Sequence, residues 1–219
     1  MEEGPLLNTF FIFDEGSTVE EDGKGTHGVN AVLSFVHYYI NEYKPLNEKR
    51  IIVQSDNCVG QNKNKYVFWY YGYMLKRGLV KEVELHFLQV GHTKFSSDQY
   101  FGLLSKQFNQ TDTILPEDLQ ALGNSVSKSF ALLYGQEGKT WSWFDWKTFL
   151  TGNFLDVPGL TKFFFYKVFL GTDGLVMIAC QMTVDGVSQV HALSVAGKEF
   201  DGVPGPVSQE DFRPRELII

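Results

Sequence analysis

Residues 8–108 alternate between strand-like and helix-like segments, and this alternation constrains the fold more than any other feature of the sequence. The strand-like runs are short and rich in β-branched and aromatic residues, whereas the helix-like runs place apolar residues at helical spacing. Strands are expected at 8–13, 50–55 and 83–90, and helices at 26–41, 64–78 and 96–108. Such an alternation predicts parallel strands in a sheet that is covered by helices.

The second half of the chain has a different pattern. A helix is expected from Pro116 to Gly135, and a short aromatic helix at 142–150. Three strands follow, joined by turns at Asp173-Gly174 and Asp185-Gly186. We therefore expect an α/β core over residues 1–109 and, over 110–219, a small C-terminal α+β subdomain with a three-stranded antiparallel sheet.

The chain has 219 residues and a formal net charge of -7, which argues against a purely electrostatic nucleic-acid binder. The balance is uneven, because residues 44–81 hold eight Lys and Arg against two acidic residues. That excess favours either solvated helix faces or a local anion-binding surface. Nucleic acid is therefore kept as a candidate partner, and the composition does not decide between a protein partner and a homo-oligomer.

Cysteine usage and the apolar runs bear on location. Cys58 and Cys180 are the only cysteines and lie far apart, which fits a reducing compartment. The acidic N-terminus lacks the cationic start of a signal peptide. Lys167 and the GTDG turn break the longest apolar run, so that run predicts two strands and not a membrane span. We expect an intracellular protein, nuclear or cytoplasmic.

Polar side chains follow the expected strands at their carboxyl ends, where α/β sheets place functional residues. Asp56 comes directly after the strand at 50–55, and Asp98 falls in the first turn of the helix at 96–108. Carboxylate oxygens suit Mg²⁺ or Mn²⁺, which leave positions open for phosphate oxygens. Each aspartate also has a structural interpretation, an Asx turn for Asp56 and a capping charge for Asp98.

The loop SDNCVGQNKN after Asp56 is rich in amides, namely Asn57, Gln61, Asn62 and Asn64. They could bind a nucleic-acid backbone, orient the carboxylates, or satisfy the loop's own backbone groups. Lys63 and Lys65 near a helix N-terminus also allow a phosphate cradle, although no Walker motif is present.

His92 and Cys58 have competing interpretations as well. His92 could be a metal ligand, a phosphate contact or a histidine bonded to backbone at the edge of the core. Cys58 has no Cys or His at zinc-ligand spacing, which excludes a zinc site of that kind. A Cys58 nucleophile with His92 as its base requires the two side chains to be close in space.

SDNCVGQNKN followed by VGHTKFSSDQYFGLLSK resembles a widespread family of uncharacterised, mostly animal proteins with the signature DNCGGQNKN … GHTKFxPDxxFG. FDWKTFL and VPGLTKFFFYKV are similar to further motifs of that family. The family looks like a transposase-derived, RNase H-like domain. The resemblance implies an RNase H-like mixed sheet with flanking helices, and metal-dependent cleavage or strand transfer on nucleic acid.

The resemblance also implies roles for individual residues. Asp56 and Asp98 would be catalytic metal ligands for Mg²⁺ or Mn²⁺. Nucleic-acid contacts would come from loop and motif residues: Asn57, Gln61, Asn62, Lys63, His92 and Lys94. Ser97 replaces the family's usual proline, and FFFY replaces its YHHF segment, which removes two histidines.

Only one strand precedes the first helix, whereas an RNase H-like domain has three there. The strand at 8–13 would then be the third of the fold, and the first two strands, with the first acid, would be lacking. The strand at 8–13 would lie two strand positions, roughly 10 Å, from the site, which is too far for direct ligation of the metal. Glu15, just after this strand, would therefore serve as a supplementary acid. We therefore expect weak or absent activity. The alternative function is a non-enzymatic binding module. An aromatic cluster would be either its partner surface or the seam that docks the C-terminal subdomain on the core: Trp141, Trp143, Phe144, Trp146 and Phe149.

Overall fold

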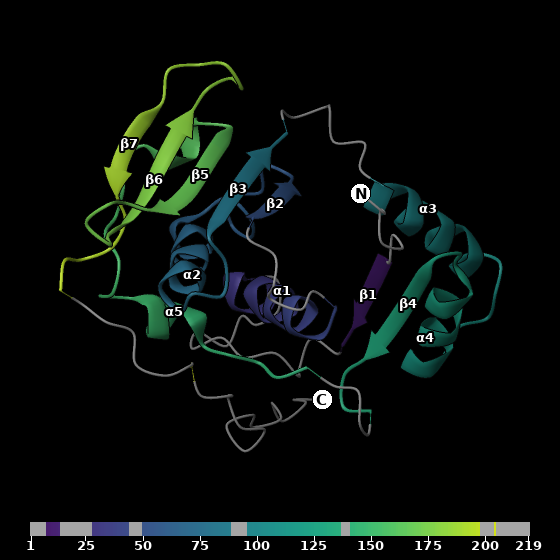
Figure 1. The fold of residues 1–219 in the computed structure, drawn as a ribbon. Coiled ribbons are helices and arrows are strands. Elements are labelled where there is room, and N and C mark those ends of the chain that lie inside the picture. The colour runs from purple at the N-terminus through teal and green to yellow at the C-terminus, as the bar shows by residue number, and fades with distance from the viewer. Residues whose placement is uncertain are drawn as a thin grey trace, which may run out of the picture. The chain divides into compact units, whose positions relative to one another are not determined.

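A computed structural model of the chain describes residues 8–13, 28–43, 50–88, 96–136, 141–197 and 204. The chain divides into two compact units. Unit 1 comprises Met1–Ser17 and Lys94–Trp141, and unit 2 comprises Thr18–Thr93 and Ser142–Ile219. Figure 1 shows the helices and strands of both units.

Unit 2 is built on a five-stranded mixed sheet in the order β2-β3-β5-β6-β7. Its strands are β2 (Arg50–Ser55), β3 (Glu82–Phe87), β5 (Phe165–Leu170), β6 (Val176–Gln181) and β7 (Gln189–Ala192). β2 and β3 are parallel, and all the other neighbours are antiparallel. The mixed α/β character predicted from the sequence is confirmed.

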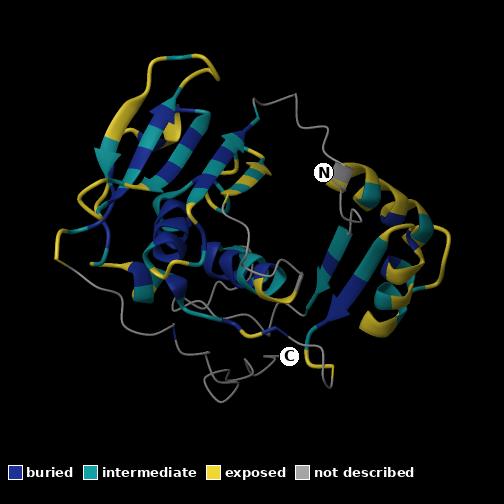
Figure 2. Ribbon diagram, viewed as in Figure 1, coloured by how far each residue is buried: buried dark blue, intermediate teal, exposed yellow. Residues whose placement is uncertain are grey.

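Helix α2 (Lys65–Lys76) forms the centre of the unit 2 core. Nine consecutive residues, Val67–Leu75, are buried, so the helix is covered on every side (Figure 2). Around it lie the sheet, α1 (Val29–Tyr43), the short helix α5 (Trp146–Leu150) and the 3₁₀ turn Leu160–Lys162. Gly72 permits a close approach here, because an added Cβ would lie 2.7 Å from Phe154 Cε1.

The sheet buries only one of its faces. On β3, Val83, Leu85 and Phe87 are buried, while the alternating residues are half-buried on the opposite face. The opposite, outer face carries Glu82 and Glu84 from β3 and the exposed Ile52 from β2. The carboxyl end of β2 is therefore held by a packed sheet, and Asp56 follows it directly.

Unit 1 contains β1 (Asn8–Ile12) paired in parallel with β4 (Ser129–Leu133), together with α3 (Ser96–Phe108) and α4 (Pro116–Ser125). Its small core gathers Phe10, Leu104, Val126 and Ala131. Gly123 of α4 lets the helix lie against β4, because an added Cβ would be 2.7 Å from Ala131 Cβ.

Three expectations about the topology are corrected by this arrangement. The strand at 8–13 pairs with β4 in a two-stranded sheet, and not with the sheet that holds β2. The helix expected to run from Pro116 to Gly135 ends at Ser125, and β4 follows it. The three C-terminal strands are antiparallel as expected, but β5 pairs with β3, so they continue the main sheet and form no sheet of their own.

No helix among the described residues has the length and apolar character that crossing a membrane requires.

Candidate metal and nucleic-acid site

Asp56 begins the loop after β2, and its side chain is exposed with one oxygen held in place. Oδ1 accepts a hydrogen bond from the Cys58 backbone N–H at 3.1 Å, which is the Asx turn expected of an aspartate there. It accepts a second from Asn62 Nδ2 at 2.8 Å. No described residue donates to Oδ2. The carboxylate is thus oriented through one oxygen and open at the other.

Asn57 ties the loop to the end of β3. Its Nδ2 donates to the Leu88 carbonyl oxygen at 2.5 Å, and its Oδ1 accepts from Lys63 Nζ at 2.8 Å. The amide oxygen and one amide N–H are therefore used inside the protein, and Asn57 supports the loop next to Asp56.

Lys63 is buried, with 3% of its surface exposed. Its ammonium lies 4.5 Å from the centre of the Phe164 ring and 5.4 Å from that of Phe87. Burial lowers the pKa of this ammonium, because desolvation disfavours the charged form. In this arrangement Lys63 holds the loop, and a phosphate in solvent could reach its ammonium only if the loop moved.

The backbone of the loop is also internally bonded. The Cys58 carbonyl accepts from the N–H groups of Gln61, Asn62 and Lys63 at 3.3, 2.8 and 3.0 Å. Asn64 caps α2, since its Oδ1 accepts from the N–H groups of the second and third residues beyond it at 3.1 and 3.3 Å. These N–H groups have partners already, so the geometry does not support a phosphate cradle at 56–64.

Gln61 differs from the other loop amides. Within the described part of the chain, its side chain makes no hydrogen bond, whereas those of Asn57, Asn62 and Asn64 each bond within or beside the loop. Gln61 is half-buried, and Cys58 beside it is exposed. Asp56 Oδ2 and the Gln61 amide are therefore two groups of this loop that no described residue occupies.

The other candidate residues lie elsewhere. Asp98 is exposed in the first turn of α3 in unit 1, while Asp56 belongs to unit 2, so the structure gives no separation between them. Glu15, His92 and Lys94 lie outside the described residues. The described residues contain no group of three or more His, Cys, Asp or Glu side chains placed to share an ion. The joint site remains a prediction.

The aromatic partner surface proposed from the sequence is wrong for its tryptophans. Trp141, Trp143 and Trp146 are 1%, 3% and 0% exposed. Trp141 packs edge-on against Phe11 in unit 1, and Trp146 against Tyr70 in unit 2, with ring centres 5.1 and 4.9 Å apart. These rings belong to the cores and cannot form a surface.

The FDWKTFL motif is attached to α1 by two buried polar residues that sequence reasoning missed. Asn30 donates to Asp145 Oδ1 at 3.1 Å and accepts from the Lys147 N–H at 2.9 Å. Ser34 accepts from the Phe144 N–H at 3.1 Å. Polar residues one turn apart on an otherwise apolar helix face are the signal that could have revealed this attachment.

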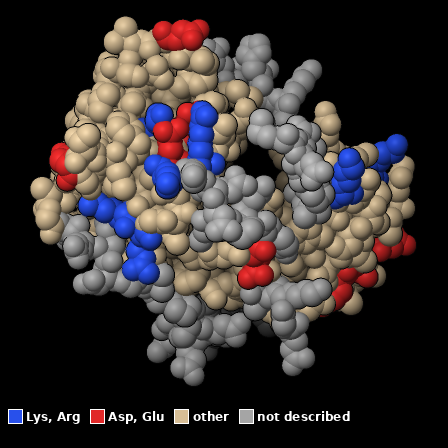
Figure 3. Space-filling view, viewed as in Figure 1, with Lys and Arg blue, Asp and Glu red and all other residues tan. Residues whose placement is uncertain are grey.

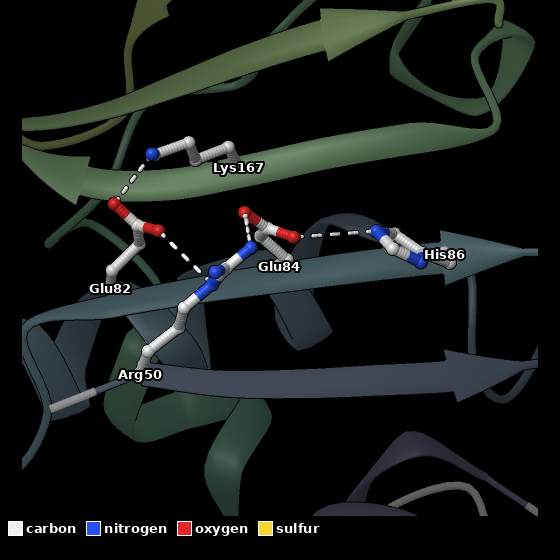
Figure 4. Close-up of polar contacts among 5 residues, drawn as sticks. All are labelled: Arg50, Glu82, Glu84, His86 and Lys167. Atoms are coloured by element: carbon white, nitrogen blue, oxygen red, sulfur yellow. Dashed lines mark hydrogen bonds and ion pairs between the residues drawn. The ribbon is translucent and has the colours of Figure 1, made fainter. Parts of the chain in front are cut away.

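Charged side chains gather on the outer face of the sheet (Figures 3 and 4). Arg50 on β2 contacts Glu84 at 2.6 Å and Glu82 at 3.4 Å, while Lys167 on β5 contacts Glu82 at 2.5 Å. The hydrogen bond from Arg50 lowers the pKa of Glu84. His86 lies 3.6 Å from Glu84. The positive charges are neutralised locally, so this face offers little excess charge to nucleic acid.

Comparison with known proteins gives one match. The family model described as "Domain of unknown function (DUF7869)" matches residues 18–185, which include the Asp56 loop and the FDWKTFL motif. Neither a curated protein nor a solved structure matches the chain significantly.

Proposed function

The chain belongs to the DUF7869 family, a domain of unknown function, and we propose that it is a transposase-derived, RNase H-like domain that acts on nucleic acid. Its ancestral reaction would be metal-dependent cleavage or strand transfer at a phosphodiester bond. Its activity in this chain would be weak or lost. Asp56 would be the principal metal ligand.

The observation that carries the proposal is the state of the Asp56 carboxylate. Two donors hold Oδ1 at 3.1 and 2.8 Å, while no described residue donates to Oδ2 of this exposed side chain. A carboxylate that is already oriented loses little freedom when a cation binds it. Its place after β2, beside the parallel strand β3, is where α/β sheets hold ligands.

Mg²⁺ or Mn²⁺ fits this donor, since both ions prefer oxygen ligands and bind readily through one or two carboxylates together with water. Asp98 would supply the second carboxylate and Glu15 a supplementary one. When bound, the ion would stabilise charge on a phosphate oxygen. Cleavage with two metal ions needs a second cation. Two principal carboxylates can hold one cation more readily than two cations, and this supports weak or absent activity.

The remaining loop residues would have supporting roles. Asn57, Asn62 and Lys63 would hold the Asp56 loop in place, because their side chains bond to one another, to Asp56 or to the end of β3. Gln61 would contact the nucleic-acid strand, together with His92 and Lys94.

Calorimetric titration of the full chain with Mn²⁺ tests the metal role of Asp56. Binding is expected in the parent chain and is expected to be lost in Asp56→Asn and weakened in Asp98→Asn. Asp156→Asn is the matched control, because Asp156 is another exposed carboxylate of unit 2, paired with Lys65 at 3.2 Å. Absence of Mn²⁺ binding in the parent chain, or equal binding by Asp56→Asn and Asp156→Asn, would refute the metal site.

Labelled single-stranded DNA and RNA then separate the proposed function from a non-enzymatic binding module. The proposed function predicts that the chain binds single-stranded nucleic acid and that Mn²⁺ strengthens this binding. In Asp56→Asn the strengthening by Mn²⁺ should be lost. A binding module predicts strand binding that is independent of Mn²⁺ and unaffected by Asp56→Asn.

A further inference from the structure

The last strand of the unit 2 sheet has an open edge. β7 bonds only to β6, and it is the outermost strand of the sheet in Figure 1. Leu193 N–H donates to the Val176 carbonyl at 2.7 Å, and the register pairs Ile178 with His191. Because inward and outward backbone groups alternate along an antiparallel strand, those of Val190 and Ala192 point away from β6. Among the described residues, none bonds to them.

This edge has only four residues in its strand, but it lacks the charged residues and proline that usually prevent strands from pairing. Residues 186–196 contain no Asp, Glu, Lys, Arg or Pro. Apolar side chains are exposed on and beside the strand, Val187 at 91% and Val190 at 52%. β2, at the opposite edge, instead begins with Arg50, which forms ion pairs on the outer face. The sheet therefore has one edge guarded by charge and one that is unguarded.

We infer that two copies of the chain pair through β7 to form a symmetric dimer with one continuous sheet. A row of unpaired N–H and C=O groups at a sheet edge is a template for an added extended strand. With a net charge of -7, two copies repel one another, and an uncharged edge is where they can meet with least repulsion.

A two-fold axis makes such a contact self-complementary, because the same strand serves both copies in antiparallel orientation. The outward groups of Val190 and Ala192 would bond to the equivalent groups of the partner copy. The exposed Val190 and Val187 side chains would be covered at the same time. This inference is independent of the metal and nucleic-acid function proposed above.

Light scattering coupled to size exclusion tests the inference on the full chain over about a hundredfold range of concentration, because dimer mass must follow mass action. The parent chain is expected to be a dimer and Val190→Lys a monomer. Ile52→Lys is the matched control, since Ile52 is 55% exposed on the opposite edge strand, and it is expected to remain dimeric. Ala192→Pro removes an outward N–H that only a second strand would use, and should also give a monomer.

A parent chain that is monomeric throughout, or a species larger than a dimer, overturns the inference. A dimer that survives Val190→Lys, or one that Ile52→Lys abolishes equally, overturns it as well. Circular dichroism of each variant establishes that the sheet is intact, and Val187→Lys, at the most exposed apolar position beside β7, provides a second substitution at the same edge.

Discussion

The ammonium of Lys63 donates to Asn57 Oδ1 over 2.8 Å, in a position where 3% of the lysine is exposed. No carboxylate lies within ion-pair distance of it among the residues that the structure describes. A buried charge is costly unless it is paired or hydrogen-bonded. The Asp56 loop is thus held to the end of β3 by the neutral Asn57 amide, and the buried Lys63 ammonium has the oxygen of that amide as its hydrogen-bond acceptor.

Replacing Asn57 alone should therefore destabilise the protein strongly. Asn57→Leu leaves the Lys63 ammonium without its oxygen acceptor, and a loss of about 3 kcal/mol in the free energy of unfolding is expected. Asn57→Leu combined with Lys63→Met also removes the buried charge and should recover about half of that loss or more, the remainder being the Leu88 carbonyl left without its donor. Urea unfolding of the two variants measures the difference.

Asn62→Leu is the control for that experiment, because its hydrogen bond to Asp56 is exposed and its loss should cost within about 1 kcal/mol. If the double variant is as unstable as Asn57→Leu, the buried charge is not the source of the cost.

The sequence predicts the elements of unit 2 that have strong local signals. β2, α2 and β3 follow from short β-branched runs and a long apolar helix that ends at Lys76, Arg77 and Gly78. The pairing of β5 with β3 has no local signal, because it joins segments far apart in the chain. The partner of β1 was unpredictable for the same reason.

The missed strand β4 has a different cause. Apolar spacing continues from α4 into the strand, so residues 116–135 suggest one helix. The chain turns at Lys128, which has a positive φ of 56°. Glycine would normally mark such a turn, and here it is absent. In the Asp56 loop, the sequence identified the important residue types, but only the burial of Lys63 assigns it and Asn57 to holding the loop.

The stability of unit 2 should fall in acid because of His37. Its Nδ1 lies 3.1 Å from the Tyr70 hydroxyl, and its ring is 5.0 Å from that of Trp146. Burial lowers the pKa of His37 below its ordinary value of 6.5, and burial also raises the pKa of Tyr70, which stays neutral. The unfolded chain therefore takes up a proton that the folded chain resists, so stability present above pH 6.5 is lost as the pH falls.

Urea unfolding of the parent chain and His37→Gln, between about pH 8 and pH 5, measures this contribution. The parent chain should lose more stability on acidification than the variant, which cannot take up that proton. Parallel curves for the two proteins would exclude His37 as the source.

The attachment of FDWKTFL to α1 should depend on Asn30. Asn30→Ala removes the donor to Asp145 Oδ1 and the acceptor for the Lys147 N–H, at a residue that is 8% exposed. A loss of about 1 to 2 kcal/mol is expected, since the half-buried Lys147 N–H loses its acceptor while Asp145 Oδ1 keeps the Thr148 N–H as a donor. Asn41→Ala, at an exposed asparagine on the same helix, should stay within about 0.5 kcal/mol. Equal effects of the two substitutions in thermal unfolding would contradict a structural role for Asn30.

Two helical glycines should respond in opposite ways to alanine. In Gly72→Ala the new methyl would lie 2.7 Å from Phe154 Cε1 and 3.2 Å from Val176 Cγ1. Overpacking of about 1 to 3 kcal/mol should outweigh the gain in helix propensity of about 1 kcal/mol, so the variant should be less stable. At Gly102 on α3 no heavy atom lies within 4 Å, and Gly102→Ala should raise stability by about 0.5 to 1 kcal/mol. Urea midpoints measure both changes, and a stabilised Gly72→Ala would mean that Phe154 moves aside without cost.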